Sequence, residues 1–577
     1  MRRVVRLLAL SVLCGTFVAR GDTPDTRTRT WVWPTRMVWC TNAVDSALLV
    51  SPRYGQVPEG KFLEGSGCRL VKKDGDAVAA VLLDFGRELH GGLQIGNGNS
   101  TRKAAVRVRF GESVGEAMAE LGDRNAGNDH AIRDSVIDLP WLGAREVGNT
   151  GFRFVRIDLV TPGTLSLQFV RAVSLMRPMP RLGAFRCSDE RLNRIWETAV
   201  NTVHLCCQEY LWDGIKRDRL VWMGDTHPET RAILTAFGAA RVLPETLDYA
   251  AETTDAKTSV MNGMPNYSLW WVRNLHDWYH FTGDKAYLAK HAQYLKTLVP
   301  RFVAAVGADG SQRWGGFLDW PSQHNSAAQQ SGTCGLMKTT LENAAFLARG
   351  LGDAETEATC CEGLARLKRA KPDPNGSKQA AALLALAGLR EPKEMYDEVL
   401  GKDGVNGVST FYGYYMLEAM SAAGENAAAL STVRDYWGAM LDMGATSFWE
   451  DFNVAWTNNA TRLDEMPVAG KKDIHGDFGE FCYTGYRHSL CHGWSSGPAA
   501  WLVNHVLGLR PTAVGCTAVE VKPFLGDLDW AEGALALPTG EAVKVRVEKR
   551  PDGSLKTTVD APKGVKVTVS ECPGSRS

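Results

Sequence analysis

One short stretch of the chain gathers carboxylic acids around a tryptophan in a way that suggests catalysis. Residues 212–229 read WDGIKRDRLVWMGDTHPE and hold four carboxylates within 17 residues: Asp213, Asp218, Asp225 and Glu229. Paired carboxylic acids cleave glycosidic bonds, because one, protonated, assists the leaving group while the other, ionised, activates water or attacks. Charged clusters are also common in solvated loops, so the alternative is a loop without chemistry.

Asp218 is the candidate for the protonated acid. Leu220 and Trp222 follow it closely, and burial against apolar side chains raises the pKa of a carboxyl group. Arg217 and Arg219 flank it, however, and nearby cations lower that pKa. The acid role therefore requires that both arginines point away, or that another carboxylate raises the pKa again. The alternative role for Asp218 is a structural salt bridge.

Two further segments place acids among aromatic residues. GATSFWEDF contains Glu450 with Asp451 beside it, and GGFLDWP contains Asp319. Tryptophan offers a flat apolar face and one hydrogen-bond donor, which suits a sugar ring, although large cores use it too. The tryptophans next to these acids are therefore candidate sugar platforms: Trp222, Trp320 and Trp449.

The end of the first stretch is also a good helix start. Asp225 or Thr226 can serve as the N-cap, and Pro228 fits the first turn. Glu229 would then complement the helix dipole from the same turn. Asp225 can combine capping with the binding of a sugar hydroxyl.

Neither a cofactor nor a metal is expected. The chain lacks a Walker loop, a GxGxxG fingerprint, an HExxH pair and a G-x-S-x-G elbow. His488 and His492 would share one face of a helix, but zinc needs further ligands and none stands at a typical spacing. Lys+Arg and Asp+Glu both total 65, so no net charge would attract nucleic acid or an anionic membrane. Nothing in the sequence fixes the oligomeric state.

The first 21 residues are expected to be a signal peptide, not part of the fold. Three arginines precede the apolar run LLALSVLCGTFVA, which is too short to span a bilayer. Ala19-Arg20-Gly21 then gives a small-x-small cleavage signal. A lipid-anchored form through Cys14 is less favoured, because small residues do not precede it. We therefore expect an exported protein, periplasmic or secreted.

At 577 residues the chain is too long for one ordinary domain, and its sequence pattern changes twice, from strand to helix and back to strand. Residues 22–178 contain alternating runs such as AAVRVRFGE (104–112), which predict an antiparallel β-sandwich. Residues 184–508 contain about a dozen helical patterns joined by Gly- or Pro-containing loops. Because no strict repeat is visible, a closed α/α barrel of hairpins is favoured over a solenoid. Residues 510–577 return to strand patterns and predict a small β domain.

This order of domains, together with several motifs, resembles the glycoside hydrolase family 78 α-L-rhamnosidases, which are six-hairpin glycosidases. LLDFGRELHGG (82–92) resembles a strand of the family's N-terminal domain. FRCSDERLNRIWE (185–197) resembles the entry into its (α/α)6 barrel, and FLGDLDWAEGALALPTGEAVKV (524–545) resembles its C-terminal domain. The resemblance covers nearly the whole chain after residue 21.

The family's signature, D-C-P-x-R-x-E-R-L-G-W-x-G-D, aligns with the opening stretch from its W-x-G-D end. The alignment puts Asp218 where the family has its general acid Glu, Trp222 on the Trp and Asp225 on the final Asp. Asp213 falls at the front, one residue closer than in the commoner form. Gly214-Ile215 replaces Cys-Pro, and the acid is shorter by one methylene, which withdraws its carboxyl by about 1.5 Å.

The resemblance also implies a partner for the acid. The family's second carboxylate lies in a T-x-W-E segment, which ATSFWED matches at Glu450, implying a general base that activates water with inversion. In SLCHGWSSGPAAWL, His492 matches the family's histidine before the last helix and is expected to bind sugar hydroxyls. The expected sugar-binding residues are Asp213, Arg217, Trp222, Asp225, Asp319, Trp320, Trp449 and His492.

The expected activity is therefore hydrolysis of a terminal α-L-rhamnoside or a related glycoside, with a carbohydrate as the only partner. One alternative is a polysaccharide lyase on the same toroid, in which Lys216 and Arg217 would neutralise a uronate. Another is a relative that binds sugar but has lost catalysis with the change from Glu to Asp. The natural sugar, linkage and aglycone stay open.

Overall fold

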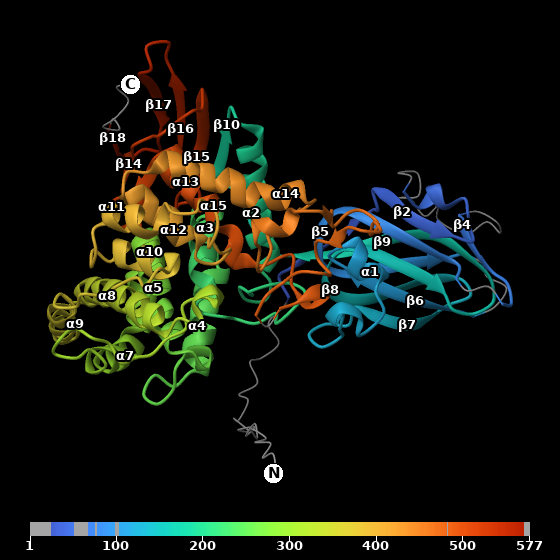
Figure 1. Cartoon of the computed structure of the whole chain (residues 1–577), viewed down its shortest axis with the longest axis horizontal. Helices are drawn as coiled ribbons and strands as arrows, with labels where there is room; N and C mark the ends of the chain where they lie inside the picture. Colours follow the sequence, from blue (N-terminus) through green and yellow to red (C-terminus); the bar gives the residue numbers. More distant parts are fainter. Residues whose placement is uncertain (1–24, 51–66, 76–77, 99–102, 482, 571–577) are drawn as a thin grey trace.

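The computed structural model describes residues 25–50, 67–75, 78–98, 103–481 and 483–570. A β domain, a ring of helices and a small C-terminal β region follow one another along the chain (Figure 1). The expected mixed fold class, a six-hairpin helical domain flanked by two β regions, is confirmed. The expected signal peptide, residues 1–21, lies outside the described residues.

The N-terminal strands join into one antiparallel hydrogen-bonded network. Its order is β3-β4-β9-β5-β8-β6-β7, with β1 beside β9 and β2 beside β5. Alternation is visible at the start of β6, where Val106 and Val108 are buried and their neighbours Ala105 and Arg107 are partly exposed. The strands are β1 (Thr28–Val32), β2 (Arg36–Thr41), β3 (Ala43–Val44), β4 (Cys68–Lys72), β5 (Ala80–Asn97), β6 (Ala104–Gly111), β7 (Asp134–Leu139), β8 (Gly143–Leu159) and β9 (Gly163–Met176).

Six helices form a closed inner ring within the described part of the chain. Each packs against the next in the order α3, α5, α8, α10, α12 and α15, and α15 packs back against α3. This closure distinguishes a barrel from an open solenoid. The inner helices are α3 (Thr226–Phe237), α5 (Pro265–Thr282), α8 (Ser326–Leu351), α10 (Lys378–Leu386), α12 (Gly413–Ala422) and α15 (Gly497–Trp501), which continues as a π-helical turn.

The remaining helices alternate with the inner ones along the chain and pack around them. Turn residues set the hairpins: Gly352 ends α8 in the left-handed region, and the side chain of Asp353 caps the next helix through the main-chain N–H of Thr356. The outer helices are α2 (Glu190–Cys206), α4 (Val242–Thr253), α6 (Lys285–Lys290), α7 (Ala292–Ala304), α9 (Ala354–Leu367), α11 (Pro392–Met395), α13 (Asn426–Thr432) and α14 (Gly438–Asp442).

The C-terminal strands pack on the barrel and share its core. One sheet has the order β10-β15-β16-β17 and a second the order β13-β14-β18. Their bounds are β10 (Ala184–Cys187), β13 (Leu509–Pro511), β14 (Ala518–Val521), β15 (Trp530–Ala536), β16 (Ala542–Lys549), β17 (Leu555–Asp560) and β18 (Lys566–Val569). Strand β10 enters from just before α2, so residues 184–187 belong to the C-terminal sheet although they precede the barrel in sequence.

The segment between α14 and α15 joins the barrel to the N-terminal β domain (Figure 1). Thr446 accepts a hydrogen bond through Oγ1 from the main-chain N–H of Glu88, at 2.9 Å. The carbonyl of Gly444 accepts one from Arg153 Nη1, also at 2.9 Å. The carbonyl of Leu463 accepts a third from the N–H of Val114, the first residue of α1 (Val114–Met118). The loop that carries Glu450 is therefore fixed to both domains.

Two plain findings complete the fold. Among the described residues, helices long and apolar enough to cross a membrane are absent. The ten cysteines that the structure describes are free thiols, and most of them are buried. Cys206 and Cys207 both lie fully buried at the end of α2, as small apolar side chains do.

Candidate active site

A pocket with about 330 Å³ of open space lies at the end of the barrel that faces the N-terminal domain. Among the described residues, seven of the ten predicted site residues line it: Asp213, Asp218, Trp222, Asp225, Trp320, Glu450 and His492. Five others complete its wall: Met264, Tyr267, Phe317, Tyr483 and Trp494. Five separate segments of sequence thus meet in one pocket rich in carboxylates and aromatic rings.

The stretch that carries the first three acids is a tight loop closed on itself. Asp213 donates its main-chain N–H to the carbonyl of Leu220 and accepts the Leu220 N–H through Oδ1, at 3.0 and 2.9 Å. At the tip, Asp218 and Arg219 adopt left-handed conformations with φ of 52° and 58°. Residues other than glycine are strained there and need contacts that over-determine the conformation.

Asp218 projects from this tip into the pocket. Trp222 Nε1 donates to Asp218 Oδ2 at 3.2 Å, which fixes one side of the carboxyl group. Arg219 turns away from it, donating to the carbonyl of Asn149. Arg217 does not: its Nη1 lies 3.7 Å from Asp218 Oδ1. The requirement that both flanking arginines point away is therefore met by Arg219 alone.

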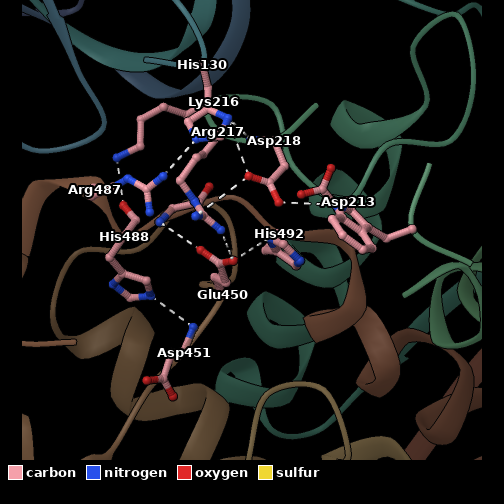
Figure 2. A network of polar contacts seen from close by, with 12 residues as sticks. His130, Asp213, Lys216, Arg217, Asp218, Glu450, Asp451, Arg487, His488 and His492 are labelled. Atoms are coloured by element: carbon pink, nitrogen blue, oxygen red, sulfur yellow. Dashed lines mark hydrogen bonds and ion pairs between the residues drawn. The ribbon is translucent and has the colours of Figure 1, made fainter. Parts of the chain in front are cut away.

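Arg217 is committed chiefly to Glu450 (Figure 2). Its Nη2 donates to Glu450 Oε1 at 2.8 Å, and its guanidinium lies over the Tyr483 ring, 3.4 Å from the centroid. The main-chain N–H of Ser489 donates to the other oxygen, Oε2, at 3.3 Å. Glu450 is 2% exposed, so Arg217 supplies the counter-charge that a carboxylate buried this deeply needs.

Asp225 and His492 form the innermost part of the pocket. Asp225 accepts from the hydroxyl of Tyr267 and pairs with His492 Nε2, both at 3.1 Å. Burial raises the pKa of Asp225. Burial alone would lower the pKa of His492, but the surrounding carboxylates, with Glu450 first, raise it overall. Asp225 precedes α3 as expected, yet its carboxylate serves this pair and makes no capping bond among the described residues.

Asp213 joins the loop of residues 212–225 to the segment that carries His492. Its carbonyl accepts the N–H of Gly493 at 2.7 Å, and Gly214 forms an isolated bridge with His492. Its carboxyl is 2% exposed, and this burial raises its pKa well above the ordinary range. Asp213 therefore reaches the pocket as a polar group held in a fixed place.

Two predicted sugar contacts lie behind the pocket wall. Asp319 accepts the Trp320 N–H at 2.8 Å and the hydroxyl of Ser409, and its burial raises its pKa to about 6. It thus fixes Trp320 in place. Trp449 is 1% exposed and packs edge-on against Phe452, so its ring belongs to the core and has no free face for a sugar.

Glu229 lies in the first turn of α3 as expected. The structure adds that the side chain is buried there, at 1% exposed. Its carboxyl packs against Gly493, where a methyl group would clash with it, and neither oxygen has a hydrogen-bond partner in the described chain. Burial, then Asp225, raises its pKa well above the ordinary range.

A second buried cluster supports the loop of residues 212–225 from the side of the N-terminal domain. Lys216 Nζ lies 3.0 Å from Glu112 and 3.3 Å from Glu116, and it donates to the carbonyls of Tyr486 and His488. Glu112, Glu116 and His475 are residue types that bind metals, and they lie close together. The lysine ammonium already provides the positive charge among them.

The predicted histidine pair is divided between two roles. His488 Nε2 accepts from the main-chain N–H of Asp451 at 2.9 Å, and burial, then Lys216, lowers its pKa well below the ordinary value. His488 therefore supports the loop as a neutral ring, while His492 faces the pocket. The two do not share a helix face, because His492 precedes the helical turn that leads into α15.

Sequence reasoning missed several residues of the site. Tyr267 and Trp494 line the pocket, and Ser489 binds Glu450 through its main chain. His130, from the N-terminal domain, contacts Asp218. A position in the first turn of a helix that starts at Pro265 was the only available signal for Tyr267. For His130 the sequence offers none, because its loop is remote in the chain and carries no motif.

A closed ring of helical hairpins, with a pocket lined by carboxylates and tryptophans at one end, defines the class of six-hairpin glycosidase folds. Residues 180–370 match the family model described as the bacterial α-L-rhamnosidase 6 hairpin glycosidase domain. This stretch of the chain matches that family, and the resemblance expected from the motifs is confirmed. No curated protein matches the chain.

Solved structures of rhamnosidases share the fold. A family GH78 rhamnosidase of Bacillus sp. GL1 is 21% identical with a TM-score of 0.73; the match covers 92% of this chain and 56% of that one. A rhamnosidase from Klebsiella oxytoca with rhamnose bound is 21% identical with a TM-score of 0.65, over 83% and 96%. The Streptomyces avermitilis α-L-rhamnosidase complexed with L-rhamnose is 16% identical with a TM-score of 0.65, over 85% and 48%. The chain thus spans little more than half of the Bacillus enzyme.

Proposed function

We propose that the chain is a glycoside hydrolase that releases terminal α-L-rhamnose, or a closely related sugar, from a glycan or glycoside with inversion. The observation that carries the proposal is the pair Asp218 and Glu450, which line one pocket with a single guanidinium between them. The family of the helical domain and the rhamnose bound in two structural neighbours support the choice of sugar.

In this proposal Asp218 is the general acid. It protonates the glycosidic oxygen as the bond to the anomeric carbon breaks, and the leaving group departs as an alcohol. Its position beside Trp222 at the tip of a closed loop supports this role. The shorter side chain requires the loop to approach the sugar closely, and the left-handed backbone of Asp218 is compatible with such an approach.

Glu450 is the general base. It accepts a proton from water as the water oxygen bonds to the anomeric carbon on the face opposite the leaving group. Inverting enzymes hold their two carboxyls roughly 6.5–9.5 Å apart so that a water molecule fits. The guanidinium of Arg217 between Asp218 and Glu450 supports a separation of this kind rather than the shorter one of retaining enzymes.

The inner end of the pocket would hold the terminal sugar. Asp213, Asp225 and His492 present fixed acceptors and donors for hydroxyl groups, and the hydroxyl of Tyr267 completes the set. Trp222, Trp320 and Trp494 provide apolar faces, which suit a 6-deoxysugar with its methyl group. Because these polar groups are buried, the pocket favours a chain end over an internal residue.

The lyase alternative fits the contacts less well. A lyase must neutralise the carboxylate of a uronate, for which Lys216 and Arg217 were the candidates. Lys216 is enclosed by Glu112 and Glu116, and Arg217 is paired with Glu450. Both cations are therefore already neutralised by carboxylates of the chain.

The test is a screen of aryl glycosides in which the anomer of the released sugar is followed by proton NMR. The expected result is hydrolysis of aryl α-L-rhamnosides with the β-anomer appearing first. Binding of rhamnosides without release of any sugar from a broad glycan panel would instead indicate the non-catalytic relative. Release of an unsaturated uronide, followed by its absorbance, would indicate the lyase.

We also propose that the protein acts after export, in the periplasm or outside the cell, on the strength of residues 1–21. Fractionation of producing cells and N-terminal sequencing test this proposal. The expected product starts after Gly21 and is absent from the cytoplasm. A cytoplasmic product that retains the apolar run would contradict it.

A further inference from the structure

His130 reaches the acid from a different domain. It lies on the loop between the helical turn Asp123–Asn125 and strand β7, in the N-terminal β domain. Its Nδ1 accepts the main-chain N–H of Asp218 at 3.2 Å and lies 3.4 Å from Asp218 Oδ1. One ring nitrogen therefore faces both the backbone and the carboxyl group of the same residue (Figure 2).

Two charged side chains hold the ring of His130 on the side opposite Asp218. Arg487 Nη2 lies 3.0 Å from His130 Nε2, and Asp129 Oδ2 lies 3.3 Å from the same nitrogen. Arg487 Nε also donates to Asp129 Oδ2 at 3.0 Å, so the three side chains form a closed set. The ring is thus fixed between this set and Asp218.

The loop that carries His130 is braced as well. The side-chain oxygen of Asn128 accepts the main-chain N–H groups of Arg133 and Asp134, at 3.0 and 3.1 Å. Arg133 in turn donates to the carbonyls of Phe110 and Glu116. These bonds tie the loop to its own domain, so His130 presents a rigid contact to the barrel.

Asp218 needs such a contact for two reasons. Its left-handed conformation is strained and persists only when neighbouring groups hold it. Its side chain is also one methylene shorter than the family's Glu, so a small shift of the backbone moves the carboxyl out of reach of the glycosidic oxygen. A displacement of about 1 Å at a reacting group can cost ~100-fold in rate.

His130 acts through Asp218 and not on the sugar. It is absent from the residues that line the sugar pocket and lies instead on a neighbouring cleft between the two domains, with Asp129 and Arg487. Its side chain is 25% exposed, toward that cleft. A direct contact with the terminal sugar is therefore not part of its role.

We propose that His130, supplied by the N-terminal β domain, is a positioning residue that holds the backbone of Asp218, and through it the carboxyl group, in place for protonation of the leaving group. The inference rests on the proposed function. It assigns the β domain a part in the reaction, because the acid is aligned only when the two domains are packed together.

The test uses the dependence of the rate on the leaving group, because acid catalysis matters most when the leaving group is poor. The full-length His130→Ala variant is compared with the wild type on 4-nitrophenyl and methyl α-L-rhamnosides. We expect kcat/KM on the methyl glycoside to fall by about 10- to 100-fold. On the nitrophenyl glycoside, whose leaving group needs little protonation, we expect a fall of only about 3-fold or less.

A conservative variant separates positioning from a general structural effect. His130→Asn keeps an oxygen near the place of Nδ1, where it can accept the Asp218 N–H, and is expected to recover most of the methyl glycoside rate. His324→Gln replaces an exposed histidine of the barrel and is the matched control, which should leave both rates unchanged. Thermal unfolding of each variant verifies that the fold is kept.

The outcomes divide clearly. Equal loss on both substrates in His130→Ala, or no loss, would overturn the inference, as would a His130→Asn variant as impaired as His130→Ala. Because the ratio of two rates is measured within one variant, a partly unfolded sample does not imitate the expected result. A wild type that cleaves neither rhamnoside would contradict the proposed function itself, and the inference would fall with it.

Discussion

The two ends of the pocket are built in different ways. At the inner end, Asp213, Asp225 and His492 are almost fully buried and are bonded to the barrel's own residues. At the outer end, Asp218 stands on a strained loop tip and is held by His130 from another domain. In the proposed function, recognition of the sugar therefore depends on the barrel, whereas alignment of the acid depends on the contact between domains.

The electrostatic surroundings of the carboxyl groups also differ between the two ends of the pocket. Burial raises the pKa values of Asp213, Asp225 and Asp319, all on the barrel side. Asp218 instead lies near two nitrogen-bearing side chains, Arg217 and His130, at 3.7 and 3.4 Å. The buried carboxyls are therefore suited to serve as fixed hydrogen-bonding groups, while the side chain of Asp218 is 15% exposed.

The largest effect is expected at Glu450, which pairs with Arg217 at 2.8 Å and lies 3.7 Å from His492 Nδ1. Replacing Glu450 by Gln keeps the shape but removes the base, so kcat on an aryl α-L-rhamnoside should fall by about 10³-fold or more. Stopped assays with long incubation give the residual rate. Retention of the full wild-type rate would remove Glu450 from the mechanism.

The second prediction concerns the outer end. Asp218→Asn should reduce kcat/KM on methyl α-L-rhamnoside by about 10²- to 10³-fold and have a much smaller effect on the 4-nitrophenyl glycoside. Asp213→Asn is the comparison, since loss of a sugar contact should affect both glycosides alike. The reverse pattern would assign the acid to Asp213, whose pKa burial raises well above the ordinary range.

The third prediction uses pH to test the raised pKa of Asp319, a buried carboxyl group of the barrel. The pKa of Asp319 is raised to about 6 in the folded protein, above its ordinary value of 3.8. Between these two values the folded state binds more protons than the unfolded state, so this group's stabilisation is present below about pH 4 and is lost as the pH rises through about 6. The free energy of unfolding of Asp319→Asn, relative to wild type, should therefore rise by ~2 kcal/mol over this window.

Urea unfolding at several pH values measures this difference. Asparagine can still accept the Trp320 N–H, so the comparison isolates the charge. A difference that does not change with pH would show that Asp319 titrates as an ordinary carboxyl group.

The smallest effect is expected for one contact at the inner end. Asp225→Asn keeps an acceptor for Tyr267 but weakens the charged pair with His492, which should raise KM by about 10-fold with a smaller change in kcat. Initial rates over a range of rhamnoside concentrations give both constants. A selective loss of kcat with unchanged KM would move Asp225 from binding to chemistry.

Much of the fold was readable from the sequence because its signals are local. Alternation along 104–112 gives β6, and the i, i+3, i+4 pattern with caps such as Asp353 gives the helices. The carboxylates Asp213, Asp218 and Asp225 were found because they share one short loop. Glu450 was placed beside them only through the resemblance of its segment to a family motif.

Other features escaped because nothing local determines them. Glu229 follows a helix start, and only the close approach of Gly493 shows that its carboxyl is buried. Trp449 and Trp320 stand in similar sequence surroundings, yet one ring packs in the core and the other lines the pocket. His130 lies 88 residues before Asp218 in another domain.

By itself the sequence determined the element types, the order of the domains and which acids were available, since backbone propensity, apolar periodicity and short motifs are encoded within a few residues. The tertiary structure decided which acids share a pocket, that Arg217 pairs with Glu450 and that His130 meets Asp218. Those outcomes depend on the packing of distant segments, because burial and distance set the strength of each charge interaction and neither is a property of a local stretch of chain.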